Sequence, residues 1–135
     1  MLAVLALFGV SAIRSSLVNL RIAGNSQLQL EASAAAQRAI DARISSLATF
    51  TGTPAQTSGS FDATGAGQNY SVTVSAPKCV YVKAAPGFSY LVADQAPKDT
   101  TWRISAVAQA NDGSGVQVTL NEGIKVRLPT NATCN

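Results

Sequence analysis

The residues that could do chemistry in this chain are few, and they point away from catalysis. There is no histidine, which excludes a Ser-His-Asp or Cys-His arrangement and any imidazole metal ligand. Two cysteines are too few for a four-thiolate metal site. Asp94, Asp99 and Asp112 lie in stretches typical of turns, where capping or solvation is the ordinary role of a carboxylate. We therefore expect no enzyme activity, no metal site and no cofactor.

The two cysteines, Cys79 and Cys134, are candidates for a disulfide. A disulfide is the favoured state in a chain that begins with an apolar segment of the kind found in exported proteins. The bond would close a loop of about 56 residues, worth about 4 kcal/mol in the chain-entropy model. It would also fasten the C-terminal tail to the rest of the chain.

The positive charge is modest and is spread along the sequence. Ten Lys and Arg stand against seven Asp and Glu, for a net charge of +3. A nucleic-acid surface usually needs a cluster or stripe of basic residues, and no cluster is visible in the sequence. We therefore interpret these residues as surface charge and expect no nucleic-acid partner.

The composition changes near residue 50. All five prolines and most of the ten glycines follow that point, whereas Ala, Leu, Ser and Gln dominate before it. Helix formers followed by alternating β-branched residues predict an α+β chain. We expect a helical segment over residues 1–50 and a β-rich head domain over residues 51–135, closed by the C-terminal disulfide.

The first segment predicts one long helix from Leu2 to Leu47. Residues 1–13 are almost wholly apolar, and apolar residues then recur at helical spacing. The spaced apolar positions are Ile13, Leu17, Leu20, Leu28, Ile40, Ile44 and Leu47. Such a helix would be about 70 Å long, so part of it must project beyond its own head. A bare apolar helix end needs a membrane or neighbouring helices to cover it.

The apolar run is shorter than the roughly 20 residues that cross a bilayer, because Arg14 interrupts it. It also lacks the basic n-region and the break of a signal peptide. Our interpretation is that Met1 is not the natural start and that further apolar residues precede it. A genuine start with a short anchor is the alternative.

The second segment predicts a surface loop over residues 51–68, then short antiparallel strands. The turn at Asn111–Gly115 separates two of them. The expected meander packs its apolar face on the second half of the helix, through Ile40, Ile44 and Leu47. The expected strands are Tyr70–Ser75, Cys79–Lys83, Phe88–Ala93, Trp102–Gln109, Val116–Leu120 and Ile124–Leu128.

Residues Ser11–Ile40 resemble the N-terminal segment of PilX-type pilus assembly proteins, which are type IV pilin-like. The resemblance rests on Ala12-Ile13-Arg14-Ser15, on Ile22-Ala23-Gly24-Asn25 and on the Ala-rich stretch Ala32–Ile40. It implies a type IV pilin-like fold, with an antiparallel sheet packed on the helix and often a disulfide in the C-terminal region. A prepilin peptidase site and the Glu near the mature N-terminus have no counterpart in this chain.

The resemblance implies a structural subunit of an extracellular pilus, or fimbrium. The subunit would be held in the inner membrane before assembly. Its partners would be copies of itself, other pilins and the pilus assembly machinery. The alternative is a minor pilin that primes assembly or acts at the tip in adhesion or DNA uptake.

In such a filament, the N-terminal helices bundle along the axis. Gly24 and Asn25 are poor helix formers, which by itself indicates either a tolerated local softening of the helix or a place where it can unwind. The resemblance to type IV pilins implies that the helix unwinds at this segment in the filament. Arg14 and Arg21 would pair with Glu31 of another subunit or point toward a solvated gap. The side chains expected to pack in the filament core are Leu2, Leu5, Phe8, Ile13, Leu17 and Leu20.

Overall fold

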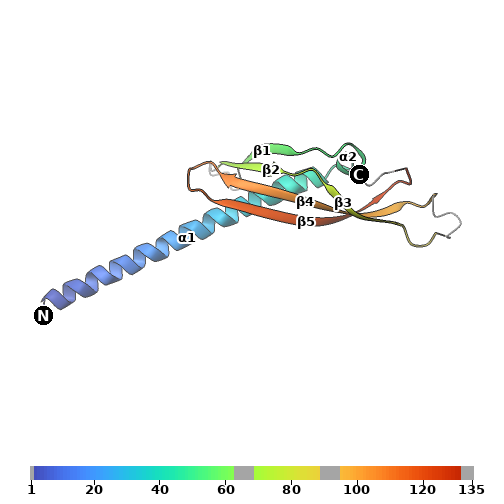
Figure 1. The fold of residues 1–135 in the computed structure, drawn as a ribbon. Helices are drawn as coiled ribbons and strands as arrows, with labels where there is room; N and C mark the ends of the chain where they lie inside the picture. Colours follow the sequence, from blue (N-terminus) through green and yellow to red (C-terminus); the bar gives the residue numbers. More distant parts are fainter. Residues whose placement is uncertain (1, 63–68, 89–94, 132–135) are drawn as a thin grey trace.

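The computed structural model describes residues 2–62, 69–88 and 95–131, with the side chains of the long helix described at positions 13, 14 and from 16 onward. The chain is α+β, as predicted: a long helix is followed by an antiparallel sheet (Figure 1). The helices are α1 (Leu2–Ile44) and α2 (Ala48–Thr51). The strands are β1 (Thr57–Asp62), β2 (Asn69–Val74), β3 (Lys78–Ala84), β4 (Lys98–Ala110) and β5 (Gln117–Leu128).

The sheet is organised around β4, its longest strand. β2 and β3 lie one after the other along one edge of β4, with Val74 opposite Ala106 and Lys78 opposite Arg103. β5 pairs with the other edge over almost the whole length of β4, and β1 pairs with β2. All these pairings are antiparallel, as predicted, but the strand order is not that of a simple meander, because β2 and β3 both pair with β4.

The second half of α1 covers one face of the sheet (Figure 1). Its buried side is mostly alanine, so the larger side chains of this core, such as Tyr70, Val72 and Ile104, come from the sheet. On the sheet, alternate residues of β2 and β4 point towards the helix, as the period-two geometry of a strand requires. The helix residues buried in this core are Ala32, Ala35, Ala36, Ala39 and Ile40.

Beyond the end of α1, the core continues through Trp102, the largest fully buried side chain. The ring of Phe50 in α2 packs on Trp102 with centroids 5.5 Å apart at an interplanar angle of 58°. Trp102 Nε1 donates to Thr100 Oγ1 at 2.8 Å, and that hydroxyl donates to the carbonyl of Val126 at 2.8 Å. The indole therefore ties α2, β4 and β5 together with its polar atom satisfied.

The helix ends three residues earlier than predicted. Thr49 Oγ1 donates to the carbonyl of Arg43 at 2.7 Å and so satisfies one of the orphan acceptors at the end of α1. Of the three expected packing residues, Ile40 is buried and Ile44 contacts the core, but Leu47 is 55% exposed. The assignment of Leu47 to the packed face was therefore wrong.

Two strand predictions were also wrong. The segment 51–68, predicted as a surface loop, contains β1, whose mostly small and polar residues form a strand by pairing with β2. Val116–Leu120 and Ile124–Leu128 were predicted as two strands, but Gln117–Leu128 is one strand, because Asn121 and Gly123 continue the ladder opposite Ser105 and Arg103.

The remaining local predictions have mixed outcomes. The predicted turn at Asn111–Gly115 is present, with positive φ at Gly113 and Gly115 and the amide of Ser114 donating to the Asp112 carboxylate. Asp99, expected in a turn, lies in β4 instead. Of the expected strand Phe88–Ala93, residues 89–93 lie outside the described residues.

Candidate functional site

The N-terminal half of α1 projects away from the head (Figure 1). Every described side chain from Ile13 to Gln27 is exposed, and Leu28 is the first that the head partly covers. At about 1.5 Å per residue, positions 2–27 extend about 39 Å beyond the sheet. This geometry agrees with the expectation that part of the helix must project.

The projecting segment carries apolar side chains on two opposite sides. At about 100° per residue, Ile13, Leu17 and Leu20 share one side, whereas Val18 and Ile22 lie on the other. All five are exposed, Leu17 by 53% and Leu20 by 66%. Val18 and Ile22 were not among the predicted packing residues, because the prediction placed a single apolar stripe on the helix. The side chains of Leu2, Leu5 and Phe8 lie outside the described part of the helix.

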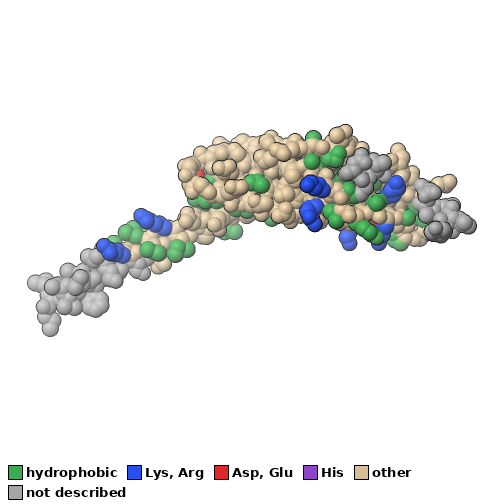
Figure 2. All heavy atoms as spheres, in the orientation of Figure 1, with side chains coloured by type: hydrophobic (Ala, Val, Ile, Leu, Met, Phe, Trp, Pro, Cys, Tyr) green, Lys and Arg blue, Asp and Glu red, His purple; other side chains and the backbone are tan. Residues whose placement is uncertain are grey.

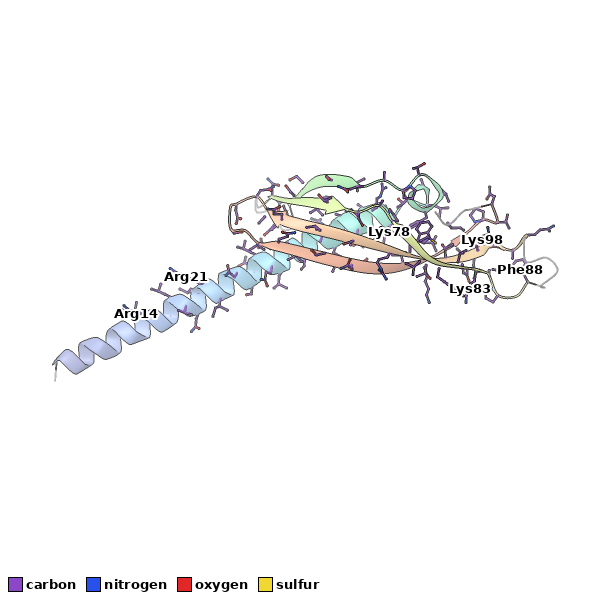
Figure 3. The ribbon with its side chains drawn as sticks, viewed as in Figure 1. Arg14, Arg21, Lys78, Lys83, Phe88 and Lys98 are labelled. Atoms are coloured by element: carbon purple, nitrogen blue, oxygen red, sulfur yellow. The ribbon has the colours of Figure 1, made fainter. Side chains whose placement is uncertain are left out.

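Arg14 and Arg21 lie two turns apart on one side of the helix, between the two apolar sides (Figure 3). Glu31 lies 10 residues beyond Arg21, which is about 15 Å along the axis and too far for contact within one chain. A pairing of either arginine with Glu31 can therefore arise only between subunits, and it stays a prediction. Over the described residues, no helix is both long and apolar enough to cross a membrane.

Gly24 and Asn25 lie inside a continuous helix in the single chain. Ser26 Oγ donates to the carbonyl of Ala23 at 2.8 Å, a local bond that competes with the helical ladder at this point. A Cβ added at Gly24 would meet no atom within 4 Å. Unwinding at this position therefore stays a prediction for the assembled state.

We expect Gly24→Ala to stiffen this segment without disturbing any contact. Alanine favours the helix by about 0.8–1 kcal/mol over glycine. If the segment unwinds on assembly, the same free energy opposes assembly, and the concentration needed to form filaments rises about fourfold. Pelleting assays over a concentration series measure this shift. An unchanged or lower assembly concentration would contradict unwinding at Gly24.

Glu31 fixes α1 to the sheet. Tyr70 in β2 is fully buried, and its hydroxyl donates to Glu31 Oε2 at 3.0 Å. Gln27 Nε2 donates to the other carboxylate oxygen, also at 3.0 Å. Burial, and then the hydrogen bond and the negative charge of Glu31, raise the pKa of Tyr70 to about 12. The sequence did not reveal this contact, because the two residues are 39 positions apart.

The raised pKa of Tyr70 predicts a loss of stability at alkaline pH. Below pH 10 the phenol is neutral in both the folded and the unfolded chain. Between pH 10 and about 12 the unfolded chain loses the proton while the folded chain keeps it, so the free energy of unfolding falls by about 3 kcal/mol. Urea denaturation of the wild type and of Tyr70→Phe between pH 9 and 12 isolates this effect. Equal slopes for the two proteins would contradict it.

A cationic surface occupies the opposite, solvent-facing side of the sheet, at the end away from the projecting helix (Figure 2). The strand register aligns its residues in rows across β3, β4 and β5. One row is Tyr81, Thr101 and Lys125, and the next is Lys83, Asp99 and Arg127. A third row places Lys78 beside Arg103. Five cations against one carboxylate make this surface more positive than the whole chain, whose net charge is +3.

The first two rows line an open pocket of about 470 Å³. Arg127 makes a bidentate contact with Asp99, with Nε–Oδ1 at 2.7 Å and Nη2–Oδ2 at 3.2 Å. The hydrogen bond from Arg127 lowers the pKa of Asp99, so this carboxylate is charged at neutral pH. Tyr81 is 58% exposed at the pocket wall. The pocket was not predicted from the sequence. Its Lys and Arg residues are far apart along the chain, and only the registers of β3 and β5 with β4 bring them together.

Of the two cysteines in the predicted disulfide, only Cys79 lies among the described residues. Cys79 lies in β3 opposite Trp102 and is disulfide-bonded. Cys134 lies outside the described residues, so the pairing of Cys79 with Cys134 stays a prediction. In the described part of the chain, no three His, Cys, Asp or Glu side chains gather where they could hold a metal ion.

No protein-family model, curated protein or solved structure matches this chain. The described residues define its class as an α+β protein, in which the second half of a long N-terminal helix packs on an antiparallel sheet. Two surfaces remain uncovered in the single chain: the apolar sides of the projecting helix and the cationic pocket.

Proposed function

We propose that this protein is a structural subunit of an extracellular filament of the type IV pilus kind. The N-terminal helices would bundle along the filament axis, and the heads would form the outer shell. The observation that carries the proposal is the projecting helix, where Leu17 and Leu20 are 53% and 66% exposed. An exposed apolar surface of this kind marks a site of association with other chains or with lipid.

The two apolar sides of the helix support association with several neighbours at once. A helix with one apolar stripe can be covered by one partner, whereas Leu17 and Ile22 face opposite directions. Burial contributes about 25 cal/mol per Å² of apolar area removed from water. A bundle that surrounds the helix covers both sides, as the core of a filament requires.

The charged residues of the projecting helix must also find partners in a bundle. Arg14 and Arg21 would be costly if buried without an opposite charge. Each oxygen of Glu31 accepts one hydrogen bond within the chain and retains a further lone pair for an arginine donor. A neighbour displaced along the axis by about 15 Å or about 26 Å would bring Arg21 or Arg14 level with this carboxylate.

We place the subunit in the inner membrane before assembly and in the extracellular pilus afterwards. Lipid covers the same apolar side chains almost as well as neighbouring helices do, so extraction yields little free energy on its own. We therefore expect assembly machinery to drive the step and other pilins to share the filament. The resemblance of Ser11–Ile40 to PilX-type proteins supports this placement. We assign the protein no enzymatic role.

A minor pilin that primes assembly or acts at the tip is the second candidate. The cationic pocket favours it, because bundling of the helices leaves this surface of the head unused. Stoichiometry separates the two roles. A bulk subunit accounts for most of the protein in purified filaments, whereas a minor pilin is a trace component.

The direct test is self-association of the full chain. We expect the protein to be dispersed in detergent and to form filaments when the detergent is removed, as observed by electron microscopy. A photo-crosslinking residue at position 17 should link helix to helix in these filaments. A chain that stays monomeric in plain buffer, with its N-terminal helix folded back on the head, would overturn the proposal.

A further inference from the structure

We propose that the pocket on the solvent-facing side of the sheet binds an acidic saccharide, a sugar that carries sulfate or carboxylate groups. The site is lined by Tyr81, Lys83, Asp99, Thr101, Lys125 and Arg127. It lies at the end of the head away from the projecting helix, as the position of Lys83 shows (Figure 3). The proposal does not depend on filament assembly, because every lining residue belongs to one chain.

The pocket carries two positive charges that no described side chain within it neutralises. Asp99 already neutralises Arg127, since the two form a bidentate ion pair. Lys125 makes no hydrogen bond or ion pair with the described residues, and Lys83 acts on Asp99 only through its charge. Two positive charges are therefore left for a ligand. They lie in adjacent rows, on the two outer strands that flank β4.

The surface between Lys83 and Lys125 is polar and is formed by β4. The hydroxyl of Thr101 lies in the middle of the first row and can donate or accept a hydrogen bond. Asp99 occupies the middle of the second row, and its carboxylate oxygens accept only. A ligand that fits must therefore combine anionic groups with hydroxyl donors, and an acidic sugar has both.

One side of the pocket is formed by the aromatic ring of Tyr81. Tyr81 exposes 58% of its surface and lies in β3 directly after a shift in the register with β4 between Cys79 and Tyr81. An exposed phenol presents an apolar ring with a polar tip, which suits the apolar face of a sugar ring with its surrounding hydroxyls. The volume of about 470 Å³ lies within the range of small-molecule sites.

A nucleic acid fits the same pocket less well. A polynucleotide binds along a continuous cationic groove with several aromatic platforms, whereas the described lining of this pocket includes one exposed aromatic residue, Tyr81. The Asp99 carboxylate oxygens accept hydrogen bonds, and the hydroxyls of a saccharide can donate to them, whereas a deoxyribose-phosphate backbone has no hydroxyl donor within the strand. The saccharide is therefore the ligand that the lining favours.

The test is calorimetric titration of the full chain in a zwitterionic detergent with a heparin tetrasaccharide, at low and at physiological salt. We expect binding that weakens as salt rises, because the attraction is between exposed charges. Lys83→Gln combined with Lys125→Gln should weaken it about tenfold. Tyr81→Ala should weaken it about fivefold through loss of the ring contact. Maltotetraose, which is uncharged, should not bind detectably.

The matched control is Lys78→Gln combined with Arg103→Gln, which removes the same charge from the same surface outside the pocket. We expect this pair to weaken binding less than threefold. Equal losses from both double variants would show diffuse attraction and overturn the pocket. If inorganic sulfate displaced the tetrasaccharide at similar concentrations, the pocket would be a general anion site and the saccharide proposal would be overturned. A four-nucleotide thymidine strand that binds as tightly would favour nucleic acid, and absence of tetrasaccharide binding would also overturn the proposal.

Discussion

Replacing Leu17 and Leu20 by serine is expected to raise the concentration needed for filament formation at least 100-fold. The two leucines lie three positions apart on one side of the projecting helix and are 53% and 66% exposed in the single chain. Covering a leucine side chain yields about 1.5–3 kcal/mol. Losing two such contacts costs about 3 kcal/mol or more per subunit, and each 1.4 kcal/mol changes an association constant tenfold.

The measurement is sedimentation of the full chain after dilution from detergent, over a range of protein concentrations. Asn19→Ser is the matched control, because Asn19 lies on the same turn, is exposed and is already polar. We expect the control to assemble like the wild type. Thermal unfolding of the head should be the same for all three proteins, since neither leucine touches it. Unchanged assembly of the double variant would show that this side of the helix is not an interface.

The long helix could be predicted from the sequence because its signals are local. Apolar spacing and the lack of proline predict α1 to within three residues of its end. The side of the helix that packs on the sheet was predicted only in part: Ile40 and Ile44 were assigned to it correctly, but its alanines were not. Alanine contributes little to an apolar pattern, yet Ala32, Ala35 and Ala36 are all fully buried. The larger Leu47 was preferred and is exposed.

The sheet was predictable where side chains alternate and not where pairing alone makes a strand. Tyr70–Ser75 alternates clearly and was predicted as a strand, close to the observed Asn69–Val74, whereas the strand Thr57–Asp62 is mostly small and polar and depends on pairing with β2. The cationic pocket belongs to the same class of feature. Lys83 and Lys125 become neighbours through two strand registers, and no local pattern in the sequence contains that information.

Trp102→Ala is expected to lower the free energy of unfolding of the head by about 3–5 kcal/mol. Removing a fully buried indole leaves a large cavity, which is the main cost of such substitutions. The change also removes the ring that packs on Phe50, and with it the hydrogen bond from Nε1 to Thr100. α2 would then lose its principal aromatic contact with the sheet.

Urea denaturation followed by far-ultraviolet circular dichroism measures this loss, because Trp102 is the only tryptophan and fluorescence is lost with it. Trp102→Phe should cost less, since a ring still packs on Phe50 and only the Nε1 donor and part of the volume are missing. Tyr81→Ala is the control for loss of an aromatic side chain, and its exposed position predicts a change below about 1 kcal/mol. If Trp102→Ala and Tyr81→Ala had equal effects, Trp102 would not be the centre of the core. A free energy of unfolding that falls from the wild type to Trp102→Phe and again to Trp102→Ala would instead show that this single indole holds α2, β4 and β5 in one cooperative unit.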